Sequence, residues 1–427
     1  MKRRLPDIRE LAPLLKFEPP RLDRVAARLD SAADIWDLRR IAQRVTPRAP
    51  FDYVDGAALD ERTLSRNRNA FAEVELLPRI LHGVDAPDTS TTIAGSRTRL
   101  PFGIAPTGYT RMMHSEGEVA GVRAATKAGI PFSLSTMGTT SVEDVAQAAP
   151  DSTRWFQLYL WKDRQRSLDL LQRAQASGYE TLLVTVDTPI TGQRLRDHRN
   201  GLTIPPRLTL GTILDASYRP GWWFNFLTTE PPKYASLSDT SQSLAEMTQT
   251  MFDPTLDLDD LRWIREQWSG RLFVKGILTA DDARRAQSVG ADGLVVSNHG
   301  GRQLDRAPDS LTSLAEVRAE VGADMELILD SGIMSGTDVV TALCAGADFV
   351  LIGRAYLYGL MAGGQRGVER AIELIRQEVL TAMGLMGARS ISDLGPDLAR
   401  GLPSAPQKTS PFASRSAAET RRSEEGV

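Results

Sequence analysis

The sequence contains one cysteine, no long apolar run and no excess of charge of one sign. Cys344 cannot form an intramolecular disulfide, and its setting in TALCAGADFVLIG predicts a buried, unreactive thiol. No stretch reaches the roughly 18 apolar residues that a membrane-spanning helix needs. Lys and Arg number 51 against 54 Asp and Glu, a formal net charge of −3, so no positive field is available for a nucleic-acid backbone. We therefore expect neither a membrane span nor a nucleic-acid partner.

Motifs for metals and nicotinamide cofactors are also missing. The four histidines, His82, His114, His198 and His299, form no HxxxH or HExxH pattern, and one cysteine makes no metal-binding cluster. No G-x-G-x-x-G fingerprint follows an apolar strand, so a dinucleotide has no obvious site. The basic start of the chain is interrupted from Pro6 onward and lacks the apolar core of a signal peptide. These absences predict no metal and favour the cytoplasm.

What the sequence does contain is a repeat of short apolar runs and amphipathic helical patterns. Eight runs lie between residues 102 and 354: FGIAPTG, FSLS, WFQLYL, TLLVTVD, LFVKGI, GLVVSN, LILDSG and FVLIGR. Several of the helical patterns between them open on Ser, Thr or Asp and close on Gly, as capped helices do. Near-continuous apolar strands alternating with helices indicate a parallel sheet covered by helices. Eight units predict an α/β fold, a TIM (β/α)₈ barrel over residues 99–390; an open doubly wound sheet is the alternative.

Three segments lie outside this repeat. Residues 1–98 contain short helical patterns and the stretch FDYVDGAALDERTLSRNRNAF, which predict an N-terminal helical lid across the barrel. An insertion of about 55 residues, roughly 200–254, separates the fourth strand from its helix, and loops of that length are usually functional. The tail at 403–427 is rich in Ser, Ala, Pro and charge, which predicts disorder.

Polar residues stand at the carboxyl ends of the predicted strands, where the side chains of such a barrel converge on one face. The loops after the seventh and eighth strands usually form a phosphate pocket in these barrels, and here they offer Asp330-Ser331-Gly332 and Gly353-Arg354. We therefore expect a phosphate-bearing ligand. The structural alternative is that Asp330 and Arg354 merely pair with each other across the barrel mouth.

His299 and Asp187 end two of these strands and suggest proton chemistry. A carboxylate bonded to an imidazole fixes its tautomer and raises its basicity, as a proton-abstracting base requires. Arg302 and Arg194 follow in the same two loops, and two guanidinium groups suit a substrate carboxylate. The alternatives are a structural histidine and two surface arginines.

Taken together, the motifs FDYVDGAALDERTL, FGIAPTG, WFQLY, TVDTP, VKGI, SNHGGRQLD, LDSGIMSGTD and LIGRAYLYG resemble those of a known family. This is the FMN-dependent 2-hydroxy acid dehydrogenase and oxidase family, which includes glycolate oxidase, mandelate dehydrogenase and bacterial L-lactate dehydrogenase. The resemblance runs from about residue 39 to residue 387. Within the family the chain most resembles quinone-linked L-lactate dehydrogenases of the actinobacterial type, which carry a similar GTILDASYRPGWWFNFLTTEPP insertion.

The resemblance implies a role for each matching residue. His299 would act as the base and Asp187 would stabilise its protonated form. The implied substrate contacts are Tyr53, Tyr159, Arg194 and Arg302. The implied FMN contacts are Lys275 near N1 and O2, then Pro106, Thr107, Gly108, Ser135, Gln157, Thr185 and Ser297 along the ring, and Asp330, Ser331, Gly332, Gly353 and Arg354 at the ribityl and phosphate.

Three positions depart from the family pattern. Gly108 stands where many relatives have alanine, which predicts extra room beside the flavin and leaves open whether the electrons go to oxygen. Met334 replaces an arginine that can help to hold the cofactor, so Arg354 would carry more of the phosphate charge. Met137 stands where relatives often have an aromatic residue, so the size of the substrate stays open.

The insertion concentrates Trp222, Trp223, Phe224 and Phe226 within five residues. Such a cluster suits a membrane interface or a quinone, and packing on the barrel or on another subunit is the alternative. The resemblance implies peripheral attachment to the inner membrane face and a homo-oligomer, commonly a tetramer.

The leading interpretation is therefore FMN-dependent oxidation of a small L-2-hydroxy acid, L-lactate to pyruvate, with a quinone or similar carrier as acceptor. One alternative is an oxygen-using 2-hydroxy acid oxidase or lactate 2-monooxygenase. Another is a flavoenzyme that matures a peptide-derived redox cofactor.

Overall fold

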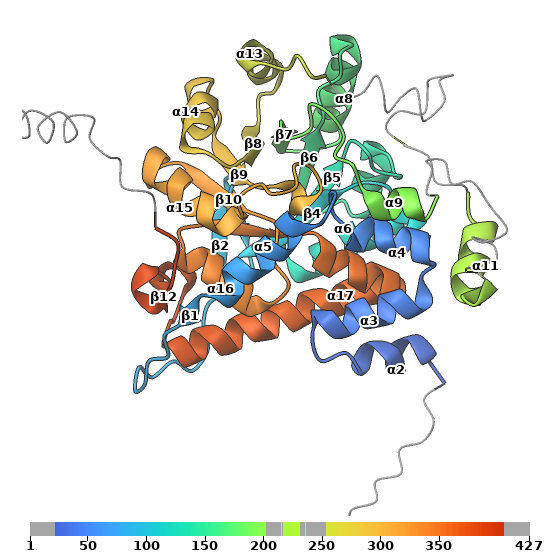
Figure 1. The fold of residues 1–427 in the computed structure, drawn as a ribbon, viewed down its shortest axis with the longest axis horizontal. Coiled ribbons are helices and arrows are strands. Elements are labelled where there is room, and N and C mark those ends of the chain that lie inside the picture. The colour runs from blue at the N-terminus through green and yellow to red at the C-terminus, as the bar shows by residue number, and fades with distance from the viewer. Residues whose placement is uncertain (1–21, 202–214, 216, 231–234, 236–252, 405–427) are drawn as a thin grey trace, which may run out of the picture.

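The computed structural model describes residues 22–201, 215, 217–230, 235 and 253–404, and its centre is a closed parallel barrel (Figure 1). The eight strands hydrogen-bond in the order β10-β11-β4-β5-β6-β7-β8-β9, which closes the sheet on itself. The predicted barrel is thus confirmed and the open sheet is excluded. The strands are β4 (Phe102–Thr107), β5 (Phe132–Ser135), β6 (Arg154–Leu158), β7 (Thr181–Thr185), β8 (Arg271–Ile277), β9 (Gly293–Val296), β10 (Glu326–Leu329) and β11 (Phe349–Ile352).

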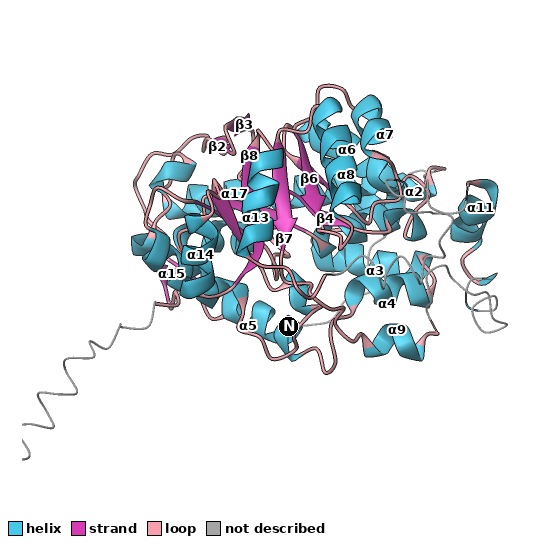
Figure 2. Cartoon of the chain, turned by 90° about the horizontal axis from the view of Figure 1, so that it is seen from above, coloured by secondary structure: helices cyan, strands magenta, loops and turns pink. Residues whose placement is uncertain are grey.

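Helices surround these strands on the outside, which explains why the strands are apolar on both faces (Figure 2). The covering helices are α6 (Gly117–Ala128), α7 (Val142–Ala148), α8 (Arg164–Ala176), α13 (Leu258–Gln267), α14 (Ala280–Ser288), α15 (Ser310–Val321), α16 (Gly336–Cys344) and α17 (Arg354–Met386). Six of them begin behind a Ser, Thr or Asp whose side chain accepts a main-chain N–H of the first turn, as the sequence predicted.

The amino-terminal mouth of the barrel is closed by a hairpin that the sequence analysis did not predict. Its strands are β2 (Thr91–Ile93) and β3 (Ser96–Thr98). Ile93 and Ala94 join the large side chains inside the barrel, including Trp155 and Phe273, in one buried apolar cluster. The main-chain N–H of Ala94 donates to the carboxylate of Glu326, the first residue of β10, at 3.1–3.2 Å. Strands of three residues are too short for their periodicity to stand out from the sequence.

The N-terminal segment is helical, and only part of it lies over the carboxyl-terminal mouth. Helices α2 (Arg24–Asp30) and α3 (Ile35–Val45) pack along α17, whereas α4 (Arg48–Asp55) and α5 (Arg62–Ala72) reach the mouth. There the Ala58 N–H donates to the Gly301 carbonyl at 2.9 Å. The short strand β1 (Glu75–Leu76) pairs with β12 (Ala399–Arg400), so the described C-terminus returns to this segment.

The long insertion is described only in part: α9 (Leu195–Arg199) precedes it, and α11 (Pro220–Thr228) lies within it. Most of the predicted 200–254 insertion, and the predicted disordered tail from residue 405 onward, lie outside the described residues. Among the helices that are described, none is both long and apolar enough to cross a bilayer. Cys344 is buried as predicted, and burial raises the pKa of its thiol to about 11.

Candidate active site

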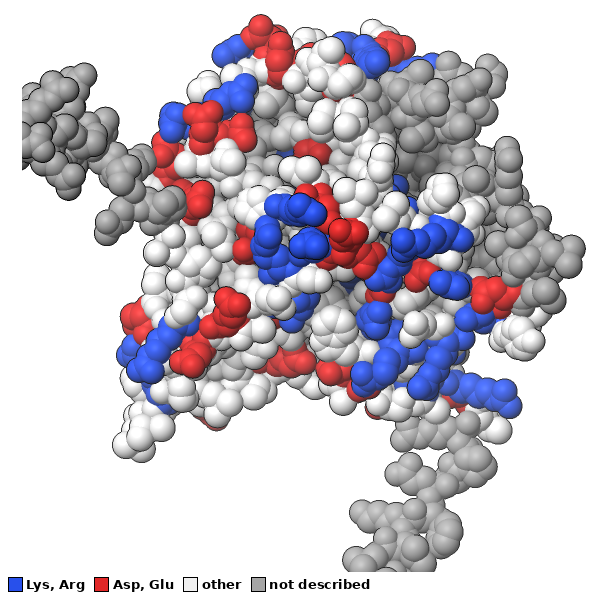
Figure 3. All heavy atoms as spheres, in the orientation of Figure 1, with Lys and Arg blue, Asp and Glu red and all other residues white. Residues whose placement is uncertain are grey.

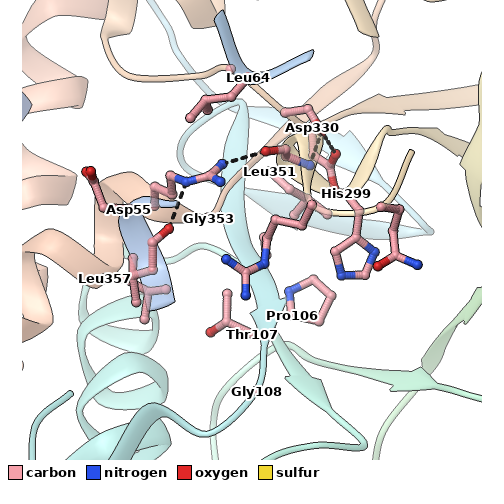
Figure 4. A pocket seen from close by; sticks show the side chains of 18 of the residues that line it. Asp55, Leu64, Pro106, Thr107, Gly108, His299, Asp330, Leu351, Gly353 and Leu357 are labelled. Atoms are coloured by element: carbon pink, nitrogen blue, oxygen red, sulfur yellow. Dashed lines mark hydrogen bonds between the residues drawn. The ribbon is translucent and has the colours of Figure 1, made fainter. Parts of the chain in front are cut away.

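A cavity of about 570 Å³ opens at the carboxyl ends of the barrel strands. Figure 4 shows His299, Asp330, Pro106 and Thr107, which come from the ends of three strands, around this space. Every residue predicted for the site lines the cavity, with the exception of Asp187 and Ser297, which lie behind its wall. The barrel therefore brings together residues that are spread over about 300 positions of the sequence.

His299 and Asp187 are paired. The Nδ1 atom of His299 lies 3.0 and 3.3 Å from the two carboxylate oxygens of Asp187. Burial alone would raise the pKa of Asp187, but the charge and hydrogen bond of His299 and the charge of Lys275 hold it below the usual value. An ionised Asp187 keeps the proton of the imidazole on Nδ1, which leaves Nε2 free to accept a proton from a ligand.

The turn that carries His299 has an unusual backbone. His299 has a φ of 57°, and Gly300 and Gly301 also lie in the left-handed region. A Cβ on Gly301 would come within 2.8 Å of the main-chain nitrogen of Leu64 in α5, so only glycine allows this close contact. The side-chain amide of Asn67, also in α5, donates to the Oδ1 atom of Asn298 at 2.9 Å. The N-terminal segment thus holds the turn that presents the imidazole.

Two arginines lie next to the ring of Tyr53. The guanidinium carbons of Arg302 and Arg194 lie 4.8 and 5.7 Å from the centre of the Tyr53 ring. Arg194 pairs with Asp197 at 2.8 Å, whereas Arg302 donates to the carbonyls of Tyr53 and Gly56. Burial and the neighbouring charge of Arg194 lower the pKa of Arg302 to about 10. Both guanidinium groups remain charged at neutral pH, and together they form a site for an anion.

Tyr159 completes this end of the cavity. Burial, followed by the charge of Asp187, raises the pKa of its phenol well above the usual value. The phenol is therefore neutral at physiological pH and can donate a hydrogen bond into the cavity.

Lys275 is a buried cation on the floor of the cavity. Its Nζ atom lies 2.9 Å from a carboxylate oxygen of Asp330 and donates to Ser297 Oγ at 2.7 Å. Burial opposes the charge, but Asp330 and Asp187 raise the pKa of the ammonium group. Ser297 is fully buried and also accepts the N–H of His299 at 3.1 Å. Ser297 therefore connects Lys275 to the His299 turn from behind the cavity wall, and its contact with the flavin stays a prediction.

The structural alternative that pairs Asp330 with Arg354 is wrong. Asp330 pairs with Lys275, and the guanidinium of Arg354 donates to three carbonyls at 2.7–2.9 Å, those of Val54, Gly56 and Gly300. These bonds use three of the five N–H groups of the guanidinium, so two remain to bind a phosphate while the carbonyl contacts are kept. Helix α17 begins directly after Gly353 with no side-chain cap, so its first N–H groups face the same end of the cavity.

The remaining wall is a chain of polar side chains at the ends of β4 to β7. Ser135 Oγ donates to Gln157 Oε1 at 2.8 Å, and Gln157 Nε2 donates to Thr185 Oγ1 at 3.0 Å. The extra room predicted beside Gly108 is absent, because a Cβ there would lie 2.7 Å from the Cβ of Met137. Met137 fills the space that a larger residue at position 108 would need.

Sequence reasoning missed a buried ion cluster beside the site. Asp55 accepts hydrogen bonds from Arg39, from Arg196 at 2.8 Å and from Tyr358 at 2.8 Å. Burial alone would raise the pKa of Asp55, but these hydrogen bonds hold it below the usual value. Arg196 also pairs with Glu61. The motif FDYVDG contained Asp55, but its partners come from three elements, α3, α9 and α17, and no local pattern could have assigned them.

Comparison with known proteins agrees with this geometry. The chain is 54% identical over 396 residues to a Mycobacterium tuberculosis protein named provisionally as an L-lactate dehydrogenase, covering 93% of this chain and 96% of that protein. It is 42% identical to an L-lactate dehydrogenase of Allorhizobium ampelinum over 86% of this chain and 98% of the relative.

Solved structures give the same picture. The monotopic membrane protein (S)-mandelate dehydrogenase superposes with a TM-score of 0.84 at 36% identity, covering 87% of this chain and all of that one. A mandelate oxidase superposes with a TM-score of 0.75 at 38% identity, covering 85% and 97%. Residues 42–401 match the sequence pattern of one family along almost the entire barrel, and the chain belongs to the FMN-dependent dehydrogenases.

Proposed function

We propose that this protein oxidises L-lactate to pyruvate with FMN and passes the electrons to a quinone. The observation that carries the proposal is that His299, paired with Asp187 at 3.0 Å, lines one cavity with two guanidinium groups and a buried lysine. The relatives named as L-lactate dehydrogenases support the choice of lactate. They match over most of their own length, so the comparison covers the whole catalytic unit.

The residues present fit FMN. The cavity has the size of a cofactor site, and its far end combines the uncapped start of α17 with Gly332, Gly353 and Arg354, a donor set suited to a phosphate. Pro106, Thr107, Gln157 and Lys275 would lie along the ring. When bound, FMN supplies the acceptor for the two electrons of the oxidation.

Substrate binding is assigned to the arginine pair. Arg194 and Arg302 would hold the carboxylate of lactate, and the hydroxyls of Tyr53 and Tyr159 would contact its polar groups. Both guanidinium groups contact the Tyr53 ring, which would help to hold them in place. Helices α4 and α5 would act as a lid that keeps water from this end of the cavity.

His299 takes the proton. Its Nδ1 is committed to Asp187, so Nε2 accepts the proton that the substrate loses, and the carboxylate stabilises the imidazolium that results. The buried charge of Lys275 lies where it would offset negative charge that develops on the cofactor side. Lactate loses two electrons and two protons in total, of which His299 receives one.

The test is anaerobic reduction of the flavin by a panel of acids. L-lactate is expected to bleach the yellow protein and to yield one pyruvate per flavin, whereas D-lactate does not. Absence of bleaching with every short L-2-hydroxy acid contradicts the proposal.

The second candidate is an oxidase or lactate 2-monooxygenase that uses the same half-reaction and then oxygen. The mandelate oxidases among the structural neighbours favour it. Oxygen uptake with formation of peroxide or acetate, compared with the rate of reduction of a quinone analogue, separates the two. We expect quinone reduction to be the faster.

The acceptor site is proposed to lie near a membrane surface. Helix α11 exposes Phe224 and Leu227, at 68% and 69%, and Tyr218 just before it is 83% exposed. Trp222 is instead half-buried, stacks on Phe226 at 4.8 Å and donates to the Met112 carbonyl, which ties α11 to the barrel. Arginines, with acidic residues among them, gather on the same face of the molecule over α2 and α3 (Figure 3).

We propose that this surface attaches the protein to the inner face of the membrane, as a homotetramer. Co-sedimentation with vesicles is expected to fall when Phe224 and Leu227 are replaced by serine, with lactate-to-dye turnover retained. Light scattering after size exclusion measures the subunit number.

A further inference from the structure

Ser331 occupies a backbone conformation that disfavours any side chain. It follows Asp330 at the end of β10 and has a φ of 75°, in the left-handed region where glycine is preferred. A residue stays in such a strained conformation only when the surrounding contacts hold it there, and residues of this kind are most common at functional sites. Its main chain is held by Ser310, whose hydroxyl donates to the Ser331 carbonyl at 2.9 Å.

The hydroxyl of Ser331 is completely used within the protein. It donates to Asp330 Oδ1 at 2.7 Å and accepts the N–H groups of Gly300 at 2.9 Å and Asn298 at 3.3 Å. A hydroxyl has one donor and two acceptor positions, so none is left. The direct cofactor contact that the resemblance implies for Ser331 therefore cannot come from its hydroxyl while these bonds hold.

These bonds belong to a closed ring of interactions that joins Ser331, Asp330, Lys275, Ser297 and the main chain of the His299 turn. Lys275 pairs with Asp330 on one side and donates to Ser297 on the other. Ser297 accepts the N–H of His299, and Ser331 accepts the N–H of the next residue. Two consecutive N–H groups of the His299 turn are thus held by serines that are bonded to opposite members of the same ion pair.

We infer that Ser331 is a positioning residue for the oxidation, an assignment that rests on the proposed function of the same site. Its hydroxyl fixes the turn that presents His299, and its hydrogen bond to Asp330 stabilises the negative charge of that carboxylate. Asp330 then attracts the Lys275 ammonium group less strongly, so the positive charge of Lys275 acts more strongly on the cofactor side of the cavity. Without the hydroxyl, the turn loses two acceptor bonds, and Asp330 draws more strongly on Lys275.

Two substitutions separate this role from a structural one. Ser331→Ala and Ser331→Gly both delete the hydroxyl, but only the glycine also removes the left-handed strain. Both are expected to lower kcat for L-lactate by about tenfold or more, because hydrogen bonds to a charged pair are lost. KM is expected to change little, since the arginine pair is untouched. The flavin midpoint potential is expected to fall in both variants.

The two Ser331 variants are expected to differ in melting temperature, although they lose the same hydroxyl. The Ser331→Gly variant melts at a higher temperature than Ser331→Ala, although its kcat is equally low. Ser141→Ala is the matched control, because it removes a serine hydroxyl that caps α7 and whose hydrogen bonds are to Asp144, not to a member of the ring. This control is expected to lower the melting temperature and to leave kcat unchanged.

Two results overturn the inference: a kcat for Ser331→Gly equal to that of the unaltered protein, or a kcat that follows the melting temperature across the two variants. If the unaltered protein fails to oxidise L-lactate, the proposed function is what fails. The midpoint potential then decides the inference by itself, since a fall in both variants supports the ring and an unchanged potential refutes it.

Discussion

The two mouths of the barrel are built from the same eight strands and differ in what the strands hold between them. At the amino-terminal mouth, Trp155 packs on Phe273 and Phe349 with ring centres 6.4 and 5.9 Å apart, and the β2–β3 hairpin covers them. At the carboxyl-terminal mouth the same strands end in ionisable groups around a cavity. The apolar mouth holds the barrel closed, which allows the other mouth to bury charges that would be costly elsewhere.

Three carboxylates at the carboxyl-terminal mouth are buried together with cationic partners. Asp187 has His299, Lys275 has Asp330, and Asp55 has Arg39 and Arg196. An unpaired buried charge is costly, so each partner is needed to keep the other ionised. We therefore expect substitutions at this mouth to reduce activity more than stability, and substitutions at the other mouth to do the reverse.

The largest effect is expected at Asp187. Asp187→Asn keeps the shape of the pair, but an amide can donate to Nδ1 and so favour the wrong imidazole tautomer. We expect kcat for L-lactate to fall by about 10²–10⁴-fold, the usual contribution of a positioned base. Stopped-flow reduction of the flavin measures this rate. A decrease of less than threefold would contradict the assigned role.

The second effect tests the apolar mouth. Phe273→Ala is expected to lower the free energy of unfolding by about 3–5 kcal/mol, because it leaves a cavity inside the barrel. Urea unfolding measures it, and KM for lactate is expected to be unchanged. The control is Phe224→Ala on the exposed face of α11, expected to change stability by less than about 0.5 kcal/mol.

A smaller effect is expected at Gly108. A methyl group there meets Met137, so Gly108→Ala is expected to lower stability by about 1–3 kcal/mol through overpacking and to raise KM. Adding Met137→Gly removes the Cβ that causes the contact and is expected to recover part of both losses. Unchanged stability and KM in the single variant would contradict this prediction, because they would show that Met137 can move aside at little cost.

The smallest effect concerns pH. Burial and Arg194 lower the pKa of Arg302 to about 10, so this guanidinium loses its charge as the pH rises through that value. Affinity for the lactate carboxylate is then lost, and KM is expected to rise above about pH 10 while remaining constant near neutrality. A flat KM across this range would mean that Arg194 alone binds the carboxylate.

The sequence predicted those features of the two mouths that depend on local patterns, namely the barrel strands and the polar residues near their ends. All eight strands lie in apolar runs of the sequence. Asp187 and His299 follow the ends of β7 and β9 closely, and Lys275 lies near the end of β8, where a barrel brings such residues together. The resemblance to a family then named their roles, and the matching family supports its choice of FMN.

The features that the sequence did not predict depend on contacts between distant segments. The β2–β3 hairpin closes the far mouth with strands too short to show a period. Ser297 and Gln157 look alike as polar strand-end residues, and only the packed barrel puts one behind the wall and the other on it. The occupation of the Gly108 space by Met137 likewise needed the fold, because the two residues belong to neighbouring strand ends.

The central claim is that the His299 imidazole removes a proton from a 2-hydroxy acid held beside FMN. Its most direct test is the rate of anaerobic flavin reduction by L-lactate in His299→Gln, with oxalate affinity measured alongside to show that the arginine pair still binds an acid. We predict a rate lower by about 10²–10⁴-fold with oxalate affinity and flavin content retained. A reduction rate equal to that of the unaltered protein would contradict the account.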